Sequence, residues 1–245
     1  MKAAILVVAL TVSAAQAESV TFRSGVEHTP LLELYTSEGC SSCPPAEAWV
    51  GRLRQRGDLW KGFVPVVFHV DYWNGLGWPD RFASREYSQR QRGYAAAWGT
   101  STVYTPGFVL DGAEWRAWSR ASGVPGGGGR AVGVLEVTLR DRTTAEVSFS
   151  PAEKGAPPAE VEIALLGTSI ETKVGAGENR GKTLRHEFVV LHRQGEALAG
   201  AGGKWRATFK LPATTQVPAT ALAAWVTRGA AQPPLQAVGG WLAAP

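Results

Sequence analysis

Residues 31–45, LLELYTSEGCSSCPP, decide how the rest of the chain is interpreted. The apolar run Leu31–Tyr35 predicts a buried strand, and Gly39 favours a turn after it. Two prolines follow the second cysteine and suit a helical first turn, where a missing N–H costs nothing. Apolar residues then recur at helical spacing, so the pattern predicts a helix over Pro44–Arg56 with Gly57 as its C-cap.

Cys40 and Cys43 are the only two cysteines of the chain, and they stand where this helix begins. A thiol at a helix N-terminus faces unpaired N–H groups and the positive end of the helix dipole, which lowers its pKa below the free value of about 8.5. We therefore interpret Cys40 as a candidate nucleophile. Cys43, one turn further on, is the thiol that resolves a mixed disulfide by attacking Cys40.

The first 17 residues have the pattern of a signal peptide. Lys2 is a basic n-region, residues 3–12 are apolar, and Ala15-Gln16-Ala17 is an A-x-A cleavage signal. The pattern predicts export to the periplasm or beyond, with a mature chain from residue 18, and the apolar run is too short to span a bilayer. The net charge of +4 comes with arginines spread along the sequence, which indicates solvated helix faces rather than a nucleic-acid site.

The residues after the first helix continue an alternation of strands and helices. A β-branched run at 64–70 predicts a strand buried on both faces, and residues 80–98 have a helical pattern. Asp111-Gly112 between apolar runs predicts a hairpin. Pro106 stands at the head of its first strand, a position where proline is tolerated.

A glycine-rich stretch at 122–130 predicts a linker, and the period changes to two after it. Six or seven short alternating runs predict an antiparallel β-sandwich-like domain over 131–245. One such run takes Leu184, His186, Phe188 and Val190 as a single strand. On this interpretation His186 and His192 are residues of the sandwich.

The order strand, Cys-x-x-Cys, helix, strand, helix and Pro-headed hairpin resembles the thioredoxin fold. The resemblance implies an α/β thioredoxin-like domain over 18–121, with Thr105-Pro106 against the disulfide and Glu33 as the buried acid that manages the resolving thiol's proton. More narrowly, segments such as FHVDYWNGLGWPD and GENRGKTLRHEFVV resemble those of DUF1223, a family of exported bacterial proteins whose function is not established.

The cysteine pair leaves three functions open. The first is an exported thiol–disulfide oxidoreductase that acts on protein thiols or disulfides with a redox partner, needs no organic cofactor, and uses Glu33 or His69 to move protons. The second is a copper(I)-binding or delivery protein, because Cys40, Cys43 and His69 offer the soft donors that this ion prefers. The third is a binding module with a vestigial pair. For His69 a hydrogen bond to the loop at 71–78 is an equal alternative.

Overall fold

The computed structural model describes residues 19–153, 160–201, 203–229 and 232–242, so the predicted signal peptide lies outside the described residues. The first half contains β1 (Val20–Arg23), β2 (Leu31–Thr36), α1 (Pro44–Leu53), β3 (Val64–His69), the 3-10 helix η1 (Asp71–Leu76), α2 (Arg85–Ala97), β4 (Gly107–Leu110), β5 (Ala113–Glu114) and the 3-10 helix η2 (Arg116–Arg120). The second half contains β6 (Gly133–Leu139), β7 (Thr144–Pro151), β8 (Glu160–Gly167), β9 (Ile170–Lys173), β10 (Thr183–His186), β11 (Val189–Ala197), β12 (Ala199–Ala201), β13 (Lys204–Lys210), β14 (Ala221–Thr227) and β15 (Gln236–Trp241).

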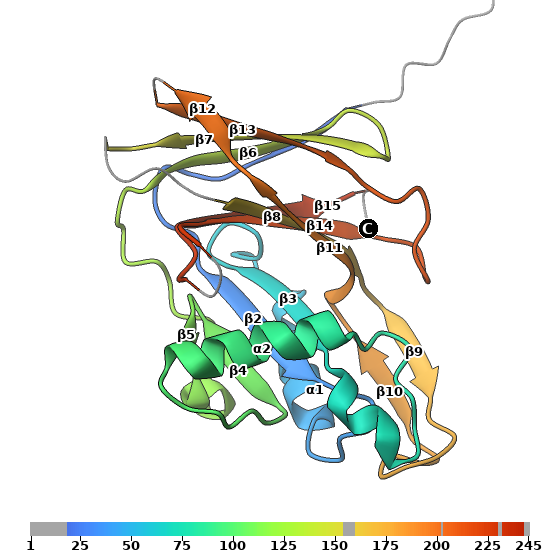
Figure 1. Ribbon diagram of the computed structural model, residues 1–245. Coiled ribbons are helices and arrows are strands. Elements are labelled where there is room, and N and C mark those ends of the chain that lie inside the picture. Colours follow the sequence, from blue (N-terminus) through green and yellow to red (C-terminus); the bar gives the residue numbers. More distant parts are fainter. Residues whose placement is uncertain (1–18, 154–159, 202, 230–231, 243–245) are drawn as a thin grey trace, which may run out of the picture.

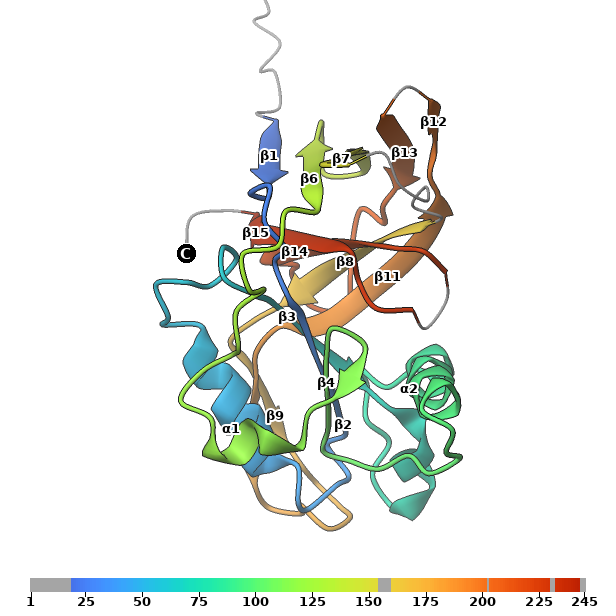
Figure 2. The same cartoon turned by 90° about the vertical axis from the view of Figure 1, so that its left-hand side faces the viewer.

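Two large sheets and one hairpin organise these strands (Figure 1). The first is a mixed eight-stranded sheet in the order β15-β14-β8-β11-β3-β2-β4-β5, and the second is a five-stranded sheet in the order β1-β6-β7-β13-β12. Among the strands that the structure describes, β9 and β10 pair only with each other, and they project away from the five-stranded sheet. In the view of Figure 2, α1 and α2 lie on opposite sides of β2, β3 and β4.

The fold-class prediction of an α/β thioredoxin-like first domain is wrong. The part of the chain that the structure describes contains two α-helices and fifteen strands, so it is mostly β. The strands β2–β5 do not form a separate sheet, because β11 pairs in parallel with β3 at Val189 and Val67 and continues the sheet into β8, β14 and β15. An apolar strand shows in sequence that its faces are buried, but it does not show which distant strand pairs with its edge.

The second half is compatible with the predicted β-sandwich. Side chains from β6, β7 and β13 meet side chains from β8, β14 and β15 in one apolar cluster, to which Leu135, Phe149, Ile163 and Leu222 belong. β1 pairs with β6, so a strand from the predicted 18–121 segment belongs to this sandwich. The eight-stranded sheet likewise contains strands from both sides of the 122–130 linker.

Local chemistry explains α1 and the hairpin that follows α2. α1 begins with Pro44 and Pro45 and buries its apolar stripe, as predicted, but it ends at Leu53. Residues 54–56 form i to i−3 hydrogen bonds that tighten the chain before Gly57, so Gly57 is not the C-cap. Asp111 and Gly112 have φ angles of 49° and 78° and join β4 to β5. Two consecutive positive φ angles are those of the predicted tight hairpin turn.

Candidate functional site

Cys40 and Cys43 form a disulfide at the N-terminal end of α1. Cys43 is the N-cap residue of α1, and its backbone N–H donates to the carbonyl of Cys40. Both residues are fully buried, so Cys40 is no more accessible than Cys43. The two cysteines are separated by three positions in sequence, so the disulfide closes a very small loop and constrains little of the unfolded chain.

The structure brings Thr105 and Pro106 next to the disulfide. Ser42 Oγ lies 3.3 Å from Cys40 Sγ and donates to the carbonyl of Thr105 at 3.4 Å. Trp73 Nε1 donates to Thr105 Oγ1 at 2.8 Å, and the Thr105–Pro106 peptide bond is cis. Four predicted site residues, two cysteines and the Thr-Pro pair, thus lie together at one end of α1.

Pro106 also lines a surface groove of about 370 Å³. The other residues that line it are mostly aromatic: Tyr104, Phe108, Trp115, Arg116 and Trp118. Aromatic walls with one cation can contact an extended peptide by burying apolar side chains.

The tip of the β9–β10 hairpin contacts the cysteine loop from outside, which the sequence did not predict. Asn179 is fully buried, and its Nδ2 donates to the carbonyls of Glu38 and Cys40 at 2.9 Å each. The Glu178 carboxylate accepts from the backbone N–H of Ser41 at 3.1 Å. These bonds join a segment of the second half of the chain to the disulfide loop.

Glu33 lies in a different environment from the cysteines. It is fully buried, and it accepts hydrogen bonds from Tyr35, Tyr94 and both ends of the Arg90 guanidinium. Arg90 also pairs with Glu162 of β8. Glu33 therefore belongs to an ion-pair network between β2 and α2, and α1 lies on the opposite side of the sheet (Figure 2).

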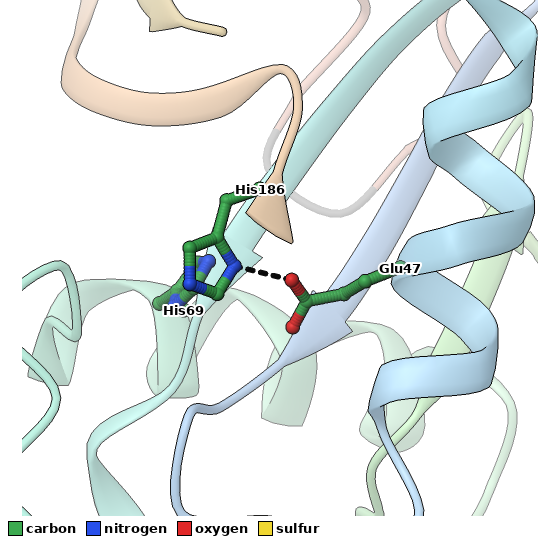
Figure 3. Close-up of side chains that lie close together, drawn as sticks. All are labelled: Glu47, His69 and His186. Carbon is green, nitrogen blue, oxygen red and sulfur yellow. Dashed lines mark hydrogen bonds and ion pairs between the residues drawn. The ribbon is translucent and has the colours of Figure 1, made fainter. Parts of the chain in front are cut away.

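His69 is placed in a cluster of buried histidines and carboxylates. Its Nδ1 is 2.7 Å from Asp80 Oδ2, so its partner is a residue beyond the 71–78 loop. The ring of His69 lies 5.2 Å from that of His186, centre to centre. Figure 3 shows these two rings together with Glu47 of α1.

The interpretation of His186 as a sandwich residue is wrong. The run from Leu184 to Val190 is not one strand, because the chain turns at Phe188, which has a φ angle of 58°. His186 therefore ends β10, pairs with Ile170 of β9 and points away from the sandwich core toward Glu47. His192 lies on β11, a strand of the eight-stranded sheet.

The ionised side chains in this cluster stabilise one another. Burial alone would lower the pKa of His186, but the carboxylates of Glu47 and Glu38 raise it to about 10. Burial would raise the pKa of Glu47, yet His186 holds it below its usual value, and His69 does the same for Asp80. In the absence of any other cation, His186 thus carries the proton between two carboxylates.

Comparison with known proteins assigns the chain to a family. A family model described as "Protein of unknown function (DUF1223)" matches residues 31–227, so the chain belongs to this family, as its sequence segments predicted. The comparison with curated proteins finds no match. No helix among the described residues is long and apolar enough to cross a membrane.

Two solved structures resemble the chain along most of its length. One is protein AGR_C_4864 from Agrobacterium tumefaciens, which is 27% identical with a TM-score of 0.59 and matches 88% of this chain and 95% of that one. The other is HBP35 of Porphyromonas gingivalis, which is 16% identical with a TM-score of 0.60 and matches 89% of this chain and 76% of that one. The second likeness concerns the fold alone.

Proposed function

We propose that this DUF1223 protein is an exported thiol–disulfide oxidoreductase that uses the Cys40–Cys43 couple. The observation that carries the proposal is that the only two cysteines form a disulfide at a helix N-terminus, beside the Thr105–Pro106 loop. A three-residue spacing stabilises a fold very little, which argues against a purely structural bond. The export part of the proposal rests on the residue pattern at 1–17.

The exchange begins with a substrate thiolate that attacks Cys40 Sγ. The Cys40–Cys43 bond breaks, Cys43 leaves as a thiolate, and a mixed disulfide joins Cys40 to the substrate. A second substrate thiolate then attacks the substrate sulfur of that bond, so the substrate becomes a disulfide and the cysteine pair a dithiol. In the reverse direction the Cys40 thiolate attacks a substrate disulfide, and Cys43 resolves the mixed disulfide.

Two features favour Cys40 as the sulfur that exchanges. Ser42 Oγ lies 3.3 Å from Cys40 Sγ, so its hydroxyl can turn from the Thr105 carbonyl to donate to a thiolate on Cys40, and the N-terminal end of α1 stabilises negative charge there. The aromatic groove beside Pro106 offers a place for the peptide that carries the substrate sulfur. We take protein thiols or disulfides as substrates for this reason.

Burial of both sulfurs sets a condition on the exchange. A substrate reaches Cys40 only when a segment that contacts the cysteine loop moves. These contacts come from the hairpin tip through Asn179 and from Thr105 through Ser42. The proposal therefore includes a local opening that exposes Cys40.

The reduction potential of the purified protein tests the proposal. The protein is equilibrated in glutathione and dithiothreitol buffers without metal, and free thiols are trapped and counted. We expect one reversible two-electron transition between roughly −300 and −100 mV, the range of exchange catalysts. Cys40→Ser should abolish exchange with a disulfide peptide, and Ser41→Ala, an exposed residue of the same loop, should retain it.

A disulfide that stays oxidised throughout this range, or a pair that never forms one, would contradict the oxidoreductase. The same result would favour a binding protein with a vestigial pair. The copper(I) alternative predicts instead that the reduced protein binds Cu(I) through Cys40 and Cys43, and that Cys40→Ser removes this binding.

A further inference from the structure

The buried cluster behind the disulfide has the composition of a metal site. Glu47 of α1, His69 of β3 and His186 of β10 each place one donor atom within 4.8 Å of the other two, and all three residues are buried (Figure 3). The side chains come from three elements, of which α1 and β3 are consecutive and β10 lies far along the chain. Neither cysteine belongs to this group.

We propose that Glu47, His69 and His186 bind a divalent transition-metal ion, with Zn²⁺ as the first candidate. Two imidazoles and one carboxylate are a donor set that zinc and iron(II) sites use, with the remaining position open to water. The site is separate from the disulfide couple and does not depend on the redox proposal.

The atoms need only a small adjustment to hold zinc. Bonds of about 2.0–2.1 Å place the ligands of a tetrahedral ion about 3.3 Å from one another. The donor atoms here lie within 4.8 Å of one another, so they would approach by at most about 1.5 Å. Without an ion, Glu47 and His186 share a direct hydrogen bond, which the ion would replace.

His69 has the outer contact of a metal ligand, and His186 has a carboxylate beside its second nitrogen. A ligating histidine usually donates its second N–H to a carboxylate, which fixes the tautomer and aims the free nitrogen at the ion. His69 Nδ1 is 2.7 Å from Asp80, which leaves Nε2 as the donor atom. His186 Nε2 lies at an ion-pair distance of 3.3 Å from Glu38 Oε1 but makes no hydrogen bond to it, and Nδ1 is the nitrogen that faces Glu47.

These outer carboxylates are themselves fixed in place. Asp80 accepts from the backbone N–H groups of Glu38 and Phe82, and Glu38 Oε2 accepts from Trp78 Nε1. On the ligand side, Thr36 Oγ1 donates to Glu47 Oε1 at 2.7 Å and leaves Oε2 for the ion. A preorganised shell of this kind lowers the cost of holding a metal.

A second, independent observation points to a ligand. His69 Nε2 has no hydrogen-bond partner among the residues that the structure describes, although the side chain is completely buried. An unsatisfied buried polar atom costs about 1–3 kcal/mol, so native structures rarely leave one without a function. A metal ion at this position would satisfy that nitrogen.

The charge balance also favours a cation. Glu38, Glu47 and Asp80 are buried carboxylates, and among the described residues their ion pairs are only with His69 and His186, not with any lysine or arginine. Buried charges are expensive unless they are compensated. A divalent ion between Glu47, His69 and His186 would supply that compensation.

Zinc titration of the oxidised protein tests the proposal, because a disulfide offers no thiolate to the metal. The full-length mature protein is stripped with a chelator, and Zn²⁺ is added in competition with a chromophoric chelator while bound metal is counted by mass spectrometry. We expect one ion per chain. His69→Gln should weaken binding about 100-fold or more, and Asp80→Asn, which removes an outer contact, about 10- to 100-fold.

Two controls separate this site from other histidines and from the cysteines. His192→Gln changes a histidine of β11 that lies outside the cluster and whose Nε2 also lacks a hydrogen-bond partner within the described part of the chain. This variant should bind zinc like the wild type. A Cys40→Ser, Cys43→Ser double variant should do the same, whatever the outcome of the redox test.

Less than stoichiometric zinc on the stripped wild-type protein would overturn the proposal without any variant. Wild-type affinity in folded His69→Gln, or loss of binding in the cysteine variant, would overturn it as well. Circular dichroism of each variant shows whether it folds. If His69→Gln does not fold, the test passes to Asp80→Asn, and wild-type zinc affinity in that variant would overturn the proposal. Cobalt(II) in place of zinc should absorb as a nitrogen and oxygen site, without a sulfur charge-transfer band.

Discussion

Asn179→Ala should make the buried disulfide much easier to reduce. Asn179 donates two hydrogen bonds to the cysteine loop, at the carbonyls of Glu38 and Cys40. Each such bond contributes about 0.5–1.5 kcal/mol net, so together they hold the hairpin tip against the loop by about 1–3 kcal/mol. If reduction requires opening of this contact, the rate follows the open population and should rise about 5- to 150-fold.

The assay follows loss of the disulfide in excess dithiothreitol, with free thiols trapped at intervals and counted by mass. Arg185→Ala is the matched control on the same hairpin, because the Arg185 side chain is 82% exposed and its ion pair is with Glu171. It should leave the rate within about twofold of the wild type, since an exposed ion pair contributes little. An unchanged rate in folded Asn179→Ala would refute the idea that the hairpin tip shields Cys40, and an equal increase in both variants would indicate general loosening of the hairpin.

Three further predictions concern stability. Arg90→Met removes the cation between two buried carboxylates and should lower the free energy of unfolding in urea by about 3–5 kcal/mol. Arg116→Ala, whose side chain is 77% exposed, should leave it almost unchanged, and equal losses in the two variants would contradict the network. Burial would lower the pKa of His28, but the hydrogen-bonded carboxylate beside it raises that pKa, so its stabilisation is complete below about pH 6.5 and is lost as the pH rises through the folded-state value. As the pH rises through this range, the free energy of unfolding of His28→Gln should therefore fall less than that of the wild type. Parallel pH profiles of the two proteins would contradict this role of His28. Gly112 has a φ of 78°, and a Cβ there would lie 3.0 Å from the Cα of Pro233, so Gly112→Ala should lower the free energy of unfolding by about 1 kcal/mol or more. Gly57→Ala places its methyl group in open space and should leave the melting temperature unchanged or higher.

The sequence predicts well those features that depend on neighbouring residues. The order of strand, cysteine loop and helix around residues 31–53 follows from apolar spacing and two prolines, and the structure has these elements in that order. The Asp111-Gly112 turn follows from the positive φ angles that these residue types tolerate. Burial of the α1 stripe follows from its 3.6-residue period.

Features that depend on distant pairing could not be predicted in the same way. β3 pairs with β11 at Val67 and Val189. The sequence around β3 contains no local pattern that predicts pairing with a strand so far along the chain. The alternation through Leu184–Val190 predicted one strand because period two continues across it, but the positive φ at Phe188 interrupts the strand. Phenylalanine is an unusual residue for that conformation, so the turn left no signal in the sequence.

This single turn explains why the sequence missed half of the candidate site. By ending β10 at residue 186, it separates β9 and β10 from the sandwich and lets the hairpin reach the cysteine loop. Its tip then supplies Asn179 to the backbone of Cys40, and its last residue supplies His186 to Glu47 of α1. The surroundings of the disulfide and the proposed metal site are thus both completed by one hairpin, inserted between two neighbouring strands of the sandwich, β8 and β11. A change that loosens this hairpin should therefore affect sulfur accessibility and metal affinity together, whereas a change at either set of residues alone should affect only one of them.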